Sequence, residues 1–154
     1  MALKKVLFVC VGNSCRSQMA EALARHHAAD VIEASSAGIS PLGSIAEPTR
    51  EVLLERGVLM PGHSSKGTTA ANIQAAELIV NMTGIHGKAL FREGLTTPVV
   101  DWEVTDPYGD EMGVYRRVCD EIEALVIELA ARLRIESQNR QPAANKHAAD
   151  PSAR

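Results

Sequence analysis

Short apolar runs alternate with segments of helical periodicity along this chain of 154 residues, and this alternation restricts the fold more than any other feature. The predicted strands are 5–10, 31–36, 77–82 and 98–101, and the predicted helices are 16–28, 47–56, 69–76, 85–92 and about 114–133. A strand, a helix and a second strand in succession form a right-handed crossover, which produces parallel strands. The sequence therefore predicts an α/β fold with a parallel sheet flanked by helices on both faces.

The chain is predicted to form one domain over residues 1–135. Its last helix carries an apolar stripe at three- and four-residue steps, formed by Val114, Val118, Ile122, Leu125, Val126, Leu129 and Leu133. From Glu136 onward Gln, Asn, Pro, Ala and Lys replace this stripe. Residues 136–154 are therefore predicted to be a disordered tail.

Composition argues against several classes of function. The net charge is −3 and charges of both signs are mixed along the chain, so nucleic acid is not an expected partner, because a polyanion requires a basic face. The apolar run 6–10 is too short for a signal peptide or a membrane span. The three cysteines lack the spacing of a disulfide framework. A cytoplasmic protein that does not bind membranes is therefore predicted.

The stretch after the first predicted strand, CVGNSCRS at 10–17, carries most of the chemical information. Ligands of parallel α/β sheets bind beyond the carboxyl ends of the strands, and this stretch lies at such an end and leads into a helix. If it curls around the helix start, its backbone N–H groups converge on one point and bind an oxyanion. The predicted phosphate-binding residues are Val11, Gly12, Asn13, Ser14, Cys15, Arg16 and Ser17.

Individual residues of this stretch fit that chemistry. Gly12 is expected to adopt a positive φ, and Asn13 is one of the residues other than glycine that best tolerate one. The planar guanidinium of Arg16 can hold two oxygens of a phosphate. A thiol at Cys10 lies beneath this positive field, which favours a nucleophilic thiolate, and the Ser17 hydroxyl is within reach of the sulfur. A cysteine ending a buried strand can also be a plain core residue, but these neighbours together favour the nucleophile.

No cofactor is predicted. The chain contains neither G-x-G-x-x-G nor G-x-x-x-x-G-K-[ST], so a dinucleotide site and a nucleotide P-loop are both unexpected. His26 and His27 are adjacent and point in different directions, and no ligand set surrounds the other histidines, so no metal is predicted either.

The chain resembles the low-molecular-weight protein tyrosine phosphatases and the arsenate reductases that share their fold. The core match is VCVGNSCRSQMAEA at 9–22, which contains the C-x5-R signature. Ser-Ala-Gly at 36–38 and Asp-Pro-Tyr-Gly at 106–109 follow in the same order and spacing, and the resemblance covers about residues 4–133. It implies a four-stranded parallel sheet in a three-layer sandwich of the phosphatase I-like type.

The resemblance also implies a two-step hydrolysis. Cys10 attacks phosphorus to form a phosphocysteine, while Asp106 protonates the leaving oxygen and later serves as base for water. Taken alone, an Asp-Pro pair would indicate only a turn. Asn13 and Ser36 match family positions that support the loop through hydrogen bonds. Tyr108 is the expected wall of the substrate slot.

The resembled proteins include both phosphatases and arsenate reductases, and the sequence features favour these two activities unequally. SCRSQMAE at 14–21 favours the reductases, but Met82 stands where a relay cysteine is expected, and methionine cannot exchange disulfides. Aromatic residues are only 3% of the chain, which supports phosphomonoester hydrolysis better than phosphotyrosine specificity. A phosphatase acting on a phosphorylated protein or a small phosphomonoester is therefore predicted, with phosphotyrosine as the family's substrate and phosphate or arsenate as inhibitor. The alternatives are an arsenate reductase using an external thiol and a non-catalytic module that binds oxyanions or phosphotyrosine.

Three other residues have weaker claims to a function, and two of them, Cys15 and Lys66, have two interpretations each. Cys15 could capture an oxidised Cys10 as a disulfide, or could be a small residue that faces the core. Cys119, at the edge of the apolar stripe, is expected to be inert packing. Lys66 could place its ammonium behind the loop, where some reductases bind potassium, or could be an exposed surface lysine.

Overall fold

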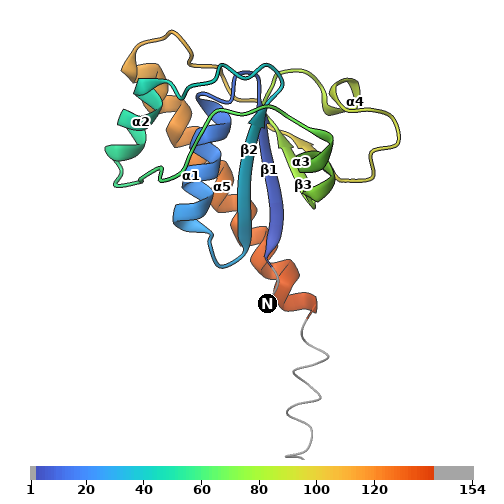
Figure 1. Cartoon of the computed structure of the whole chain (residues 1–154). Coiled ribbons are helices and arrows are strands. Elements are labelled where there is room, and N and C mark those ends of the chain that lie inside the picture. Colours follow the sequence, from blue (N-terminus) through green and yellow to red (C-terminus); the bar gives the residue numbers. More distant parts are fainter. Residues whose placement is uncertain (1–2, 141–154) are drawn as a thin grey trace, which may run out of the picture.

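Four parallel strands form the centre of the structure, which is a computed structural model describing residues 3–140 (Figure 1). Their order across the sheet is β2-β1-β3-β4. The strands are β1 (Lys4–Cys10), β2 (Ile32–Gly38), β3 (Leu78–Asn81) and β4 (Val99–Asp101). The predicted α/β fold with a four-stranded parallel sheet is confirmed.

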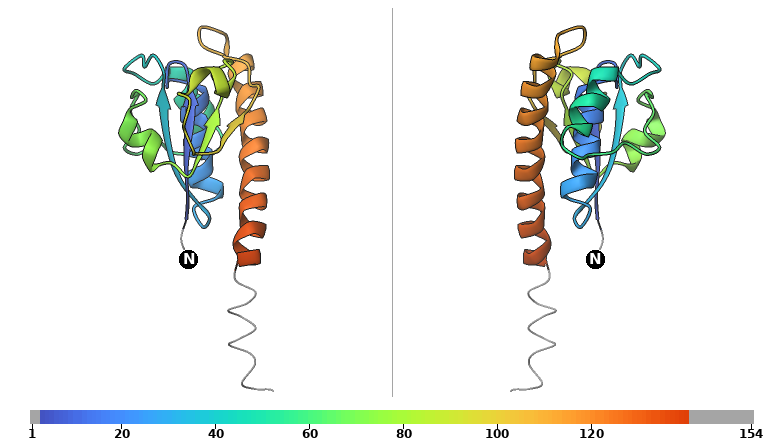
Figure 2. Two further views of the ribbon diagram at one scale, coloured as in Figure 1. Left: turned by 90° about the vertical axis from the view of Figure 1, so that its right-hand side faces the viewer. Right: turned by 90° about the vertical axis from the view of Figure 1, so that its left-hand side faces the viewer.

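Helices cover both faces of this sheet, as the two side views in Figure 2 show. The helices are α1 (Arg16–His27), α2 (Glu47–Leu54), α3 (Ala70–Ala75), α4 (Gly87–Leu90) and α5 (Met112–Arg140). α1 and α5 pack together on one face with α2 beside them, and α3 lies on the other face. The short α4 follows β3 and packs near the edge strand β4.

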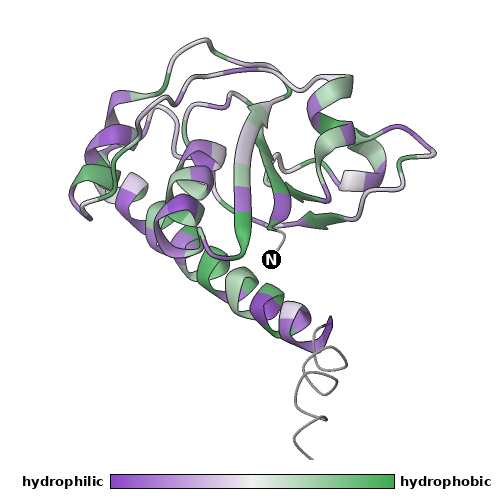
Figure 3. Ribbon diagram, turned by 60° about the horizontal axis from the view of Figure 1, so that its bottom comes forward, coloured by the Kyte–Doolittle hydropathy of each residue, from purple (hydrophilic) through white to green (hydrophobic). Residues whose placement is uncertain are grey.

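The alternation of side chains along β1 separates two hydrophobic cores. Val6 and Phe8 belong to the larger core beneath α1 and α5, while Leu7 and Val9 belong to the smaller core beneath α3. All four side chains are almost fully buried, which explains why this strand is apolar at every position from Val6 onward. Figure 3 shows hydrophobic residues along the strands and alternating hydrophobic and hydrophilic bands along α5.

Helix α5 follows the predicted stripe closely, with its buried side shifted by part of a turn. Val114, Leu125 and Leu129 of the predicted stripe are only partly buried. The buried residues are Tyr115, Val118, Cys119, Ile122, Val126, Ala130 and Leu133. Within residues 3–140, no helix combines the length and the hydrophobicity that a membrane span requires.

The helix also continues beyond the predicted start of the tail. Residues 136–140 are helical rather than disordered, and Glu136 pairs with Arg140 across one turn at 3.7 Å. Composition alone indicated an end here, but no proline or glycine interrupts the helix before Arg140. The remainder of the predicted tail, 141–154, lies outside the described residues.

Candidate active site

The loop between β1 and α1 lies at the carboxyl edge of the sheet, and its carbonyl groups all point outward into hydrogen bonds. Each carbonyl of residues 10–14 accepts at least one hydrogen bond, and the donors include, in order, Ile39 N (3.1 Å), Ser40 N (2.9 Å), Leu42 N (3.0 Å), Gln18 Nε2 (3.2 Å) and Thr49 Oγ1 (2.9 Å). The N–H groups of residues 11–15, by contrast, have no acceptor among the described residues. Because a peptide's N–H and C=O point in opposite directions, these N–H groups face the inside of the loop and can bind an oxyanion.

Asn13 fixes the shape of this loop from behind. It adopts φ +49°, the left-handed conformation expected for it. Its Nδ2 donates to the hydroxyls of Ser17 at 2.7 Å and Ser36 at 3.0 Å, and its Oδ1 accepts from Gln18 Nε2 at 3.0 Å and from Lys66 N at 2.8 Å. One buried amide therefore joins the loop to β2, to α1 and to the segment before α3.

The predicted reason for Gly12 is wrong. Its φ is outside the positive region, so conformational freedom does not explain the glycine. A Cβ at this position would lie 3.0 Å from Cγ of Leu42, which packs directly over the loop. Gly12 thus allows a close approach between two segments that are distant in sequence.

Gly38, at the end of β2, permits an even closer approach. A Cβ there would lie 2.6 Å from the carbonyl oxygen of Val11 and 2.7 Å from the backbone nitrogen of Asn13. Both neighbours are backbone atoms of the loop, so no side-chain rotation could relieve the overlap. This steric requirement gives a physical reason for the glycine in the Ser-Ala-Gly segment.

We expect Gly38→Ala to weaken phosphate binding by about tenfold or more and to destabilise the fold by about 1–3 kcal/mol, because the added methyl displaces the loop backbone. Gly113→Ala is the matched control, since a Cβ there meets nothing closer than 3.9 Å and alanine favours the helix. Urea unfolding and phosphate titration of both variants measure the two effects. Equal behaviour of the variants would contradict the steric role of Gly38.

The Cys10 thiol lies at the base of the loop and is almost completely buried, with 2% of the residue exposed. Its sulfur is 2.9 Å from Oγ of Ser17. Since Asn13 Nδ2 already donates to that hydroxyl, the Ser17 proton is directed toward the sulfur. The structure thus brings the three residues into one chain of hydrogen bonds, an arrangement that can stabilise a thiolate.

Arg16 closes the other side of the loop, and backbone carbonyls hold its side chain in place. Its Nη1 donates to the carbonyls of Met82 at 2.6 Å and Val104 at 3.3 Å, and its Nη2 lies 3.5 Å from Oδ2 of Asp106. Its buried Nε has no hydrogen-bond partner among the described residues. The guanidinium is therefore oriented before any ligand binds and retains donor capacity for an oxyanion.

A cavity of about 220 Å³ opens above the thiol. Asp106 stands at its rim with half of its side chain exposed, and its Oδ1 accepts from the backbone N–H of Tyr108 at 3.1 Å. Tyr108 lines the cavity as expected, and Leu42 is an additional wall that sequence reasoning did not identify. The Cys10 thiol, the Arg16 guanidinium and the Asp106 carboxyl group therefore share one cavity.

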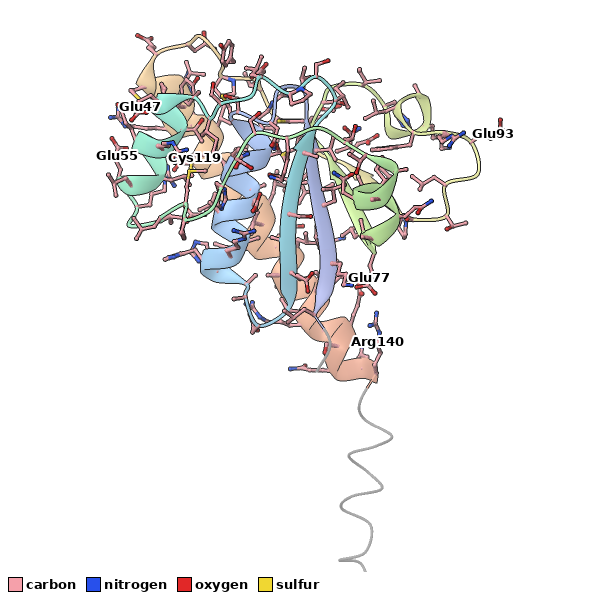
Figure 4. All side chains as sticks on the ribbon, viewed as in Figure 1. Glu47, Glu55, Glu77, Glu93, Cys119 and Arg140 are labelled. Atoms are coloured by element: carbon pink, nitrogen blue, oxygen red, sulfur yellow. The ribbon has the colours of Figure 1, made fainter. Side chains whose placement is uncertain are left out.

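Cys15 presents its sulfur to the protein interior. Its Sγ is 3.5 Å from Oη of Tyr115, and burial raises the pKa of the Cys15 thiol. Of its two interpretations, the core-facing one agrees better with this geometry. Cys119 is completely buried on α5 beside α2 (Figure 4), where burial raises its pKa to about 12.

A buried polar cluster supports the loop from the side opposite the cavity. Ser36 Oγ donates to Oε1 of Glu21 at 2.5 Å, and Nζ of Lys66 lies 3.5 Å from Ser36 Oγ and 3.9 Å from Glu21 Oε1. The ammonium thus lies beside this cluster, although the lysine side chain remains 42% exposed. Gln18, which sequence reasoning did not identify, also belongs to this region, and its Oε1 lies within hydrogen-bond distance of His63 Nδ1 at 2.9 Å. Over residues 3–140, no group of three or more His, Cys, Asp or Glu side chains could hold a metal ion.

Comparison with known proteins finds one matching family model and several related proteins. Residues 5–139 match a family model described as low molecular weight phosphotyrosine protein phosphatase. A glutaredoxin arsenate reductase from Synechocystis sp. is 33% identical, covering 85% of this chain and 99% of the relative. A protein-arginine-phosphatase from Bacillus subtilis is 31% identical, covering 84% and 96%.

Two solved structures are also similar. The YwlE arginine phosphatase from Geobacillus stearothermophilus has a TM-score of 0.79 at 31% identity, covering 88% of this chain and 96% of that one. An arsenate reductase in the phosphate binding state has a TM-score of 0.75 at 28% identity, covering 85% and 99%. The relatives therefore include proteins named for phosphate hydrolysis and proteins named for arsenate reduction.

Proposed function

Because this chain belongs to the low molecular weight phosphotyrosine protein phosphatase family, whose relatives are cysteine-dependent phosphatases or arsenate reductases, we propose that it hydrolyses phosphorylated substrates through a phosphocysteine on Cys10. The observation that carries the proposal is the placement of Asp106 beside Arg16, at the rim of the cavity whose floor is the Cys10 thiol. Oxyanion binding alone would not require a carboxyl group at this position, whereas protonation of a leaving group would require a proton donor there.

In the first step, the Cys10 sulfur attacks phosphorus and the bond from phosphorus to the leaving oxygen breaks. The loop N–H groups and Arg16 bind the non-bridging oxygens, where negative charge is spread in the transition state. Asp106 transfers its proton to the departing oxygen, which leaves as an alcohol or phenol.

In the second step, water attacks the phosphocysteine and the phosphorus–sulfur bond breaks. The Asp106 carboxylate removes a proton from the attacking water, which restores the protonated acid. The Ser17 hydroxyl, 2.9 Å from the sulfur, stabilises the thiolate as it leaves. Inorganic phosphate then remains in the loop until it dissociates, and we propose that phosphate and arsenate inhibit by occupying the same loop.

Phosphotyrosine is the predicted substrate, with Tyr108 and Leu42 on the walls of the cavity. Phosphoarginine is a second candidate, supported by similarity to two protein-arginine-phosphatases and by the presence of one aromatic wall rather than two. Parallel measurement of kcat/KM on phosphotyrosine, phosphoarginine and p-nitrophenyl phosphate separates the two. Failure to hydrolyse any of them would contradict the phosphatase assignment and favour a binding module. We further propose a cytoplasmic location, supported by three free cysteines.

Arsenate is expected to inhibit competitively without being reduced by thioredoxin. The side chain at the end of β3 is Met82, which is completely buried and cannot form the disulfide that a thiol relay needs. Cys119 cannot substitute for it, because that thiol is buried in α5 with a raised pKa.

Arsenite production should be measured with thioredoxin and, in a separate reaction, with glutathione and glutaredoxin. Cys10→Ser provides the background rate. Arsenite formed with thioredoxin would contradict the missing relay. Arsenite formed only with glutathione would support a reductase that uses an external thiol and would argue against the phosphatase.

A further inference from the structure

His63 is a buried histidine that has no part in the two steps above. It lies in the segment between α2 and α3, and its side chain is completely buried. Its Nδ1 lies 2.9 Å from Oε1 of Gln18, on α1. Its Nε2 is buried too, has no hydrogen-bond partner among residues 3–140, and lies 3.6 Å from Oε2 of Glu21. A buried polar atom without a partner calls for an explanation in terms of function.

The surroundings of Gln18 determine which nitrogen of His63 carries the proton. Gln18 Nε2 lies 2.9 Å from the carbonyl of Ser64, 3.0 Å from Asn13 Oδ1 and 3.2 Å from the carbonyl of Asn13. Only an amide NH₂ can donate to three such oxygens, so the amide oxygen of Gln18 faces His63. Because an amide oxygen can only accept, His63 Nδ1 is the donor, and in the neutral ring the lone pair is on the unpartnered Nε2.

A continuous chain of hydrogen bonds leads from His63 to the nucleophile. His63 Nδ1 donates to Gln18 Oε1 at 2.9 Å, and Gln18 Nε2 donates to Asn13 Oδ1 at 3.0 Å. Asn13 Nδ2 then donates to Ser17 Oγ at 2.7 Å, and this hydroxyl is 2.9 Å from the sulfur of Cys10. In every bond the donor is on the His63 side and the acceptor is on the Cys10 side. All five side chains are buried, so each bond polarises the next without competition from water.

Charged groups of both signs act on the imidazole ring. They are Glu21 and Arg25 on α1, Arg50 on α2 and Lys66 in the segment that carries His63. Burial lowers the pKa of His63 more than the Glu21 carboxylate raises it. The ring is therefore mainly neutral near neutral pH, and its effect on the chain comes from the Nδ1 donor rather than from a full charge.

We propose that His63 is a positioning residue for the nucleophile: its Nδ1–H begins a chain, through Gln18 and Asn13, that directs the Ser17 proton to the Cys10 sulfur and stabilises the thiolate. The inference rests on the proposed phosphatase function, in which this thiolate attacks in the first step and leaves in the second. His63 does not line the cavity, so it acts without touching the substrate.

Two substitutions separate the donor from the bulk of the side chain. His63→Leu fills the space and removes the donor, whereas the amide nitrogen in His63→Asn can take the place of Nδ1. The rate of Cys10 alkylation by iodoacetamide should be followed across the pH range in which a thiol ionises, with site-resolved mass spectrometry to separate Cys10 from Cys15. His26→Leu, at an exposed histidine near the end of α1, is the control and should leave the profile unchanged.

For His63→Leu we expect the alkylation rate at the acid end of the profile to fall by about three- to tenfold, the effect of about one hydrogen bond, and the midpoint to move to higher pH. His63→Asn should remain within about twofold of the wild type, because it restores the donor. General loosening of the loop would affect both variants, so rescue by asparagine distinguishes donation from packing.

The position of the proton can also be observed in the wild-type protein, which keeps the test available if His63→Leu fails to fold. Long-range ¹H–¹⁵N correlation spectra of the imidazole rings distinguish the two tautomers. We expect His63 to carry its proton on Nδ1 in the neutral ring.

An Nε2–H tautomer, an unchanged alkylation profile in His63→Leu, or equal shifts in His63→Leu and His63→Asn would overturn the positioning role. Alkylation does not require hydrolysis. Inactivity of the wild-type protein on phosphotyrosine, phosphoarginine and p-nitrophenyl phosphate would overturn the proposed function and leave the alkylation result in place, so the two failures are distinguishable.

Discussion

Cys10→Ser should abolish turnover while phosphate binding is largely preserved. The serine hydroxyl is a far weaker acid and nucleophile than a thiol, and a covalent mechanism has no alternative route around that step. The groups expected to bind the oxyanion, which are the loop N–H groups and Arg16, do not depend on the sulfur. We therefore expect activity on p-nitrophenyl phosphate to fall by at least ~100-fold, with the Kd for phosphate changed by less than about threefold.

Cys119→Ser is the matched control, since it makes the same chemical change at a completely buried cysteine remote from the loop. It is expected to lose stability and to retain kcat in the folded fraction. Calorimetric titration with phosphate and steady-state assays provide both quantities. Residual hydrolysis by Cys10→Ser above about one hundredth of the wild-type rate would remove Cys10 as the nucleophile.

Asp106→Asn should slow the formation of phosphocysteine by an amount that grows with the pKa of the leaving group. The amide preserves the side-chain shape and the acceptor for Tyr108 N, but it cannot supply the proton. A phenolate leaves poorly without that proton, whereas a nitrophenolate leaves almost unaided. The expected loss for phenyl phosphate or phosphotyrosine is about 10²–10⁴-fold, the range typical of general acids, and smaller for p-nitrophenyl phosphate.

Single-turnover rates are required, because steady-state kcat can instead report hydrolysis of the intermediate. Asp110→Asn, at an exposed carboxyl group in the same turn, is the control and should leave the leaving-group dependence unchanged. If Asp106→Asn lost the same factor with every leaving group, Asp106 would be a turn residue, and the proton donor would have to lie elsewhere.

The fold was predictable because its signals are local. Each strand is a short apolar run, and the alternation of strands and helices determines the parallel sheet. The end of α5 was not predictable in the same way. Composition changes at Glu136, and Leu133 is the last buried residue of the helix, but no proline or glycine interrupts its backbone between there and Arg140.

The candidate site likewise contains residues that the sequence predicts and residues that it does not. Cys10, Asn13, Arg16 and Ser17 could be identified because they occupy one continuous stretch whose spacing is itself the signal. Their tertiary partners could not be identified, because each depends on an approach between segments far apart in sequence. Gly38 meets the backbone of the loop, Leu42 packs over Gly12, Gln18 reaches Ser64, and Tyr115 meets Cys15 across 100 positions. A glycine or tyrosine in a sequence does not indicate what it will contact.

The outward-facing carbonyls of the loop between β1 and α1 have a consequence for the kinetics of the proposed phosphatase. Since they are already bonded to protein donors, the loop is rigid before a ligand arrives, and binding requires little loss of conformational entropy. This advantage is shared by every tetrahedral oxyanion of the right size, including the inorganic phosphate that each catalytic cycle leaves behind. For the proposed phosphatase, a preorganised loop would thus couple fast capture of substrate to retention of product, and the ambient phosphate concentration would set the fraction of enzyme available for catalysis.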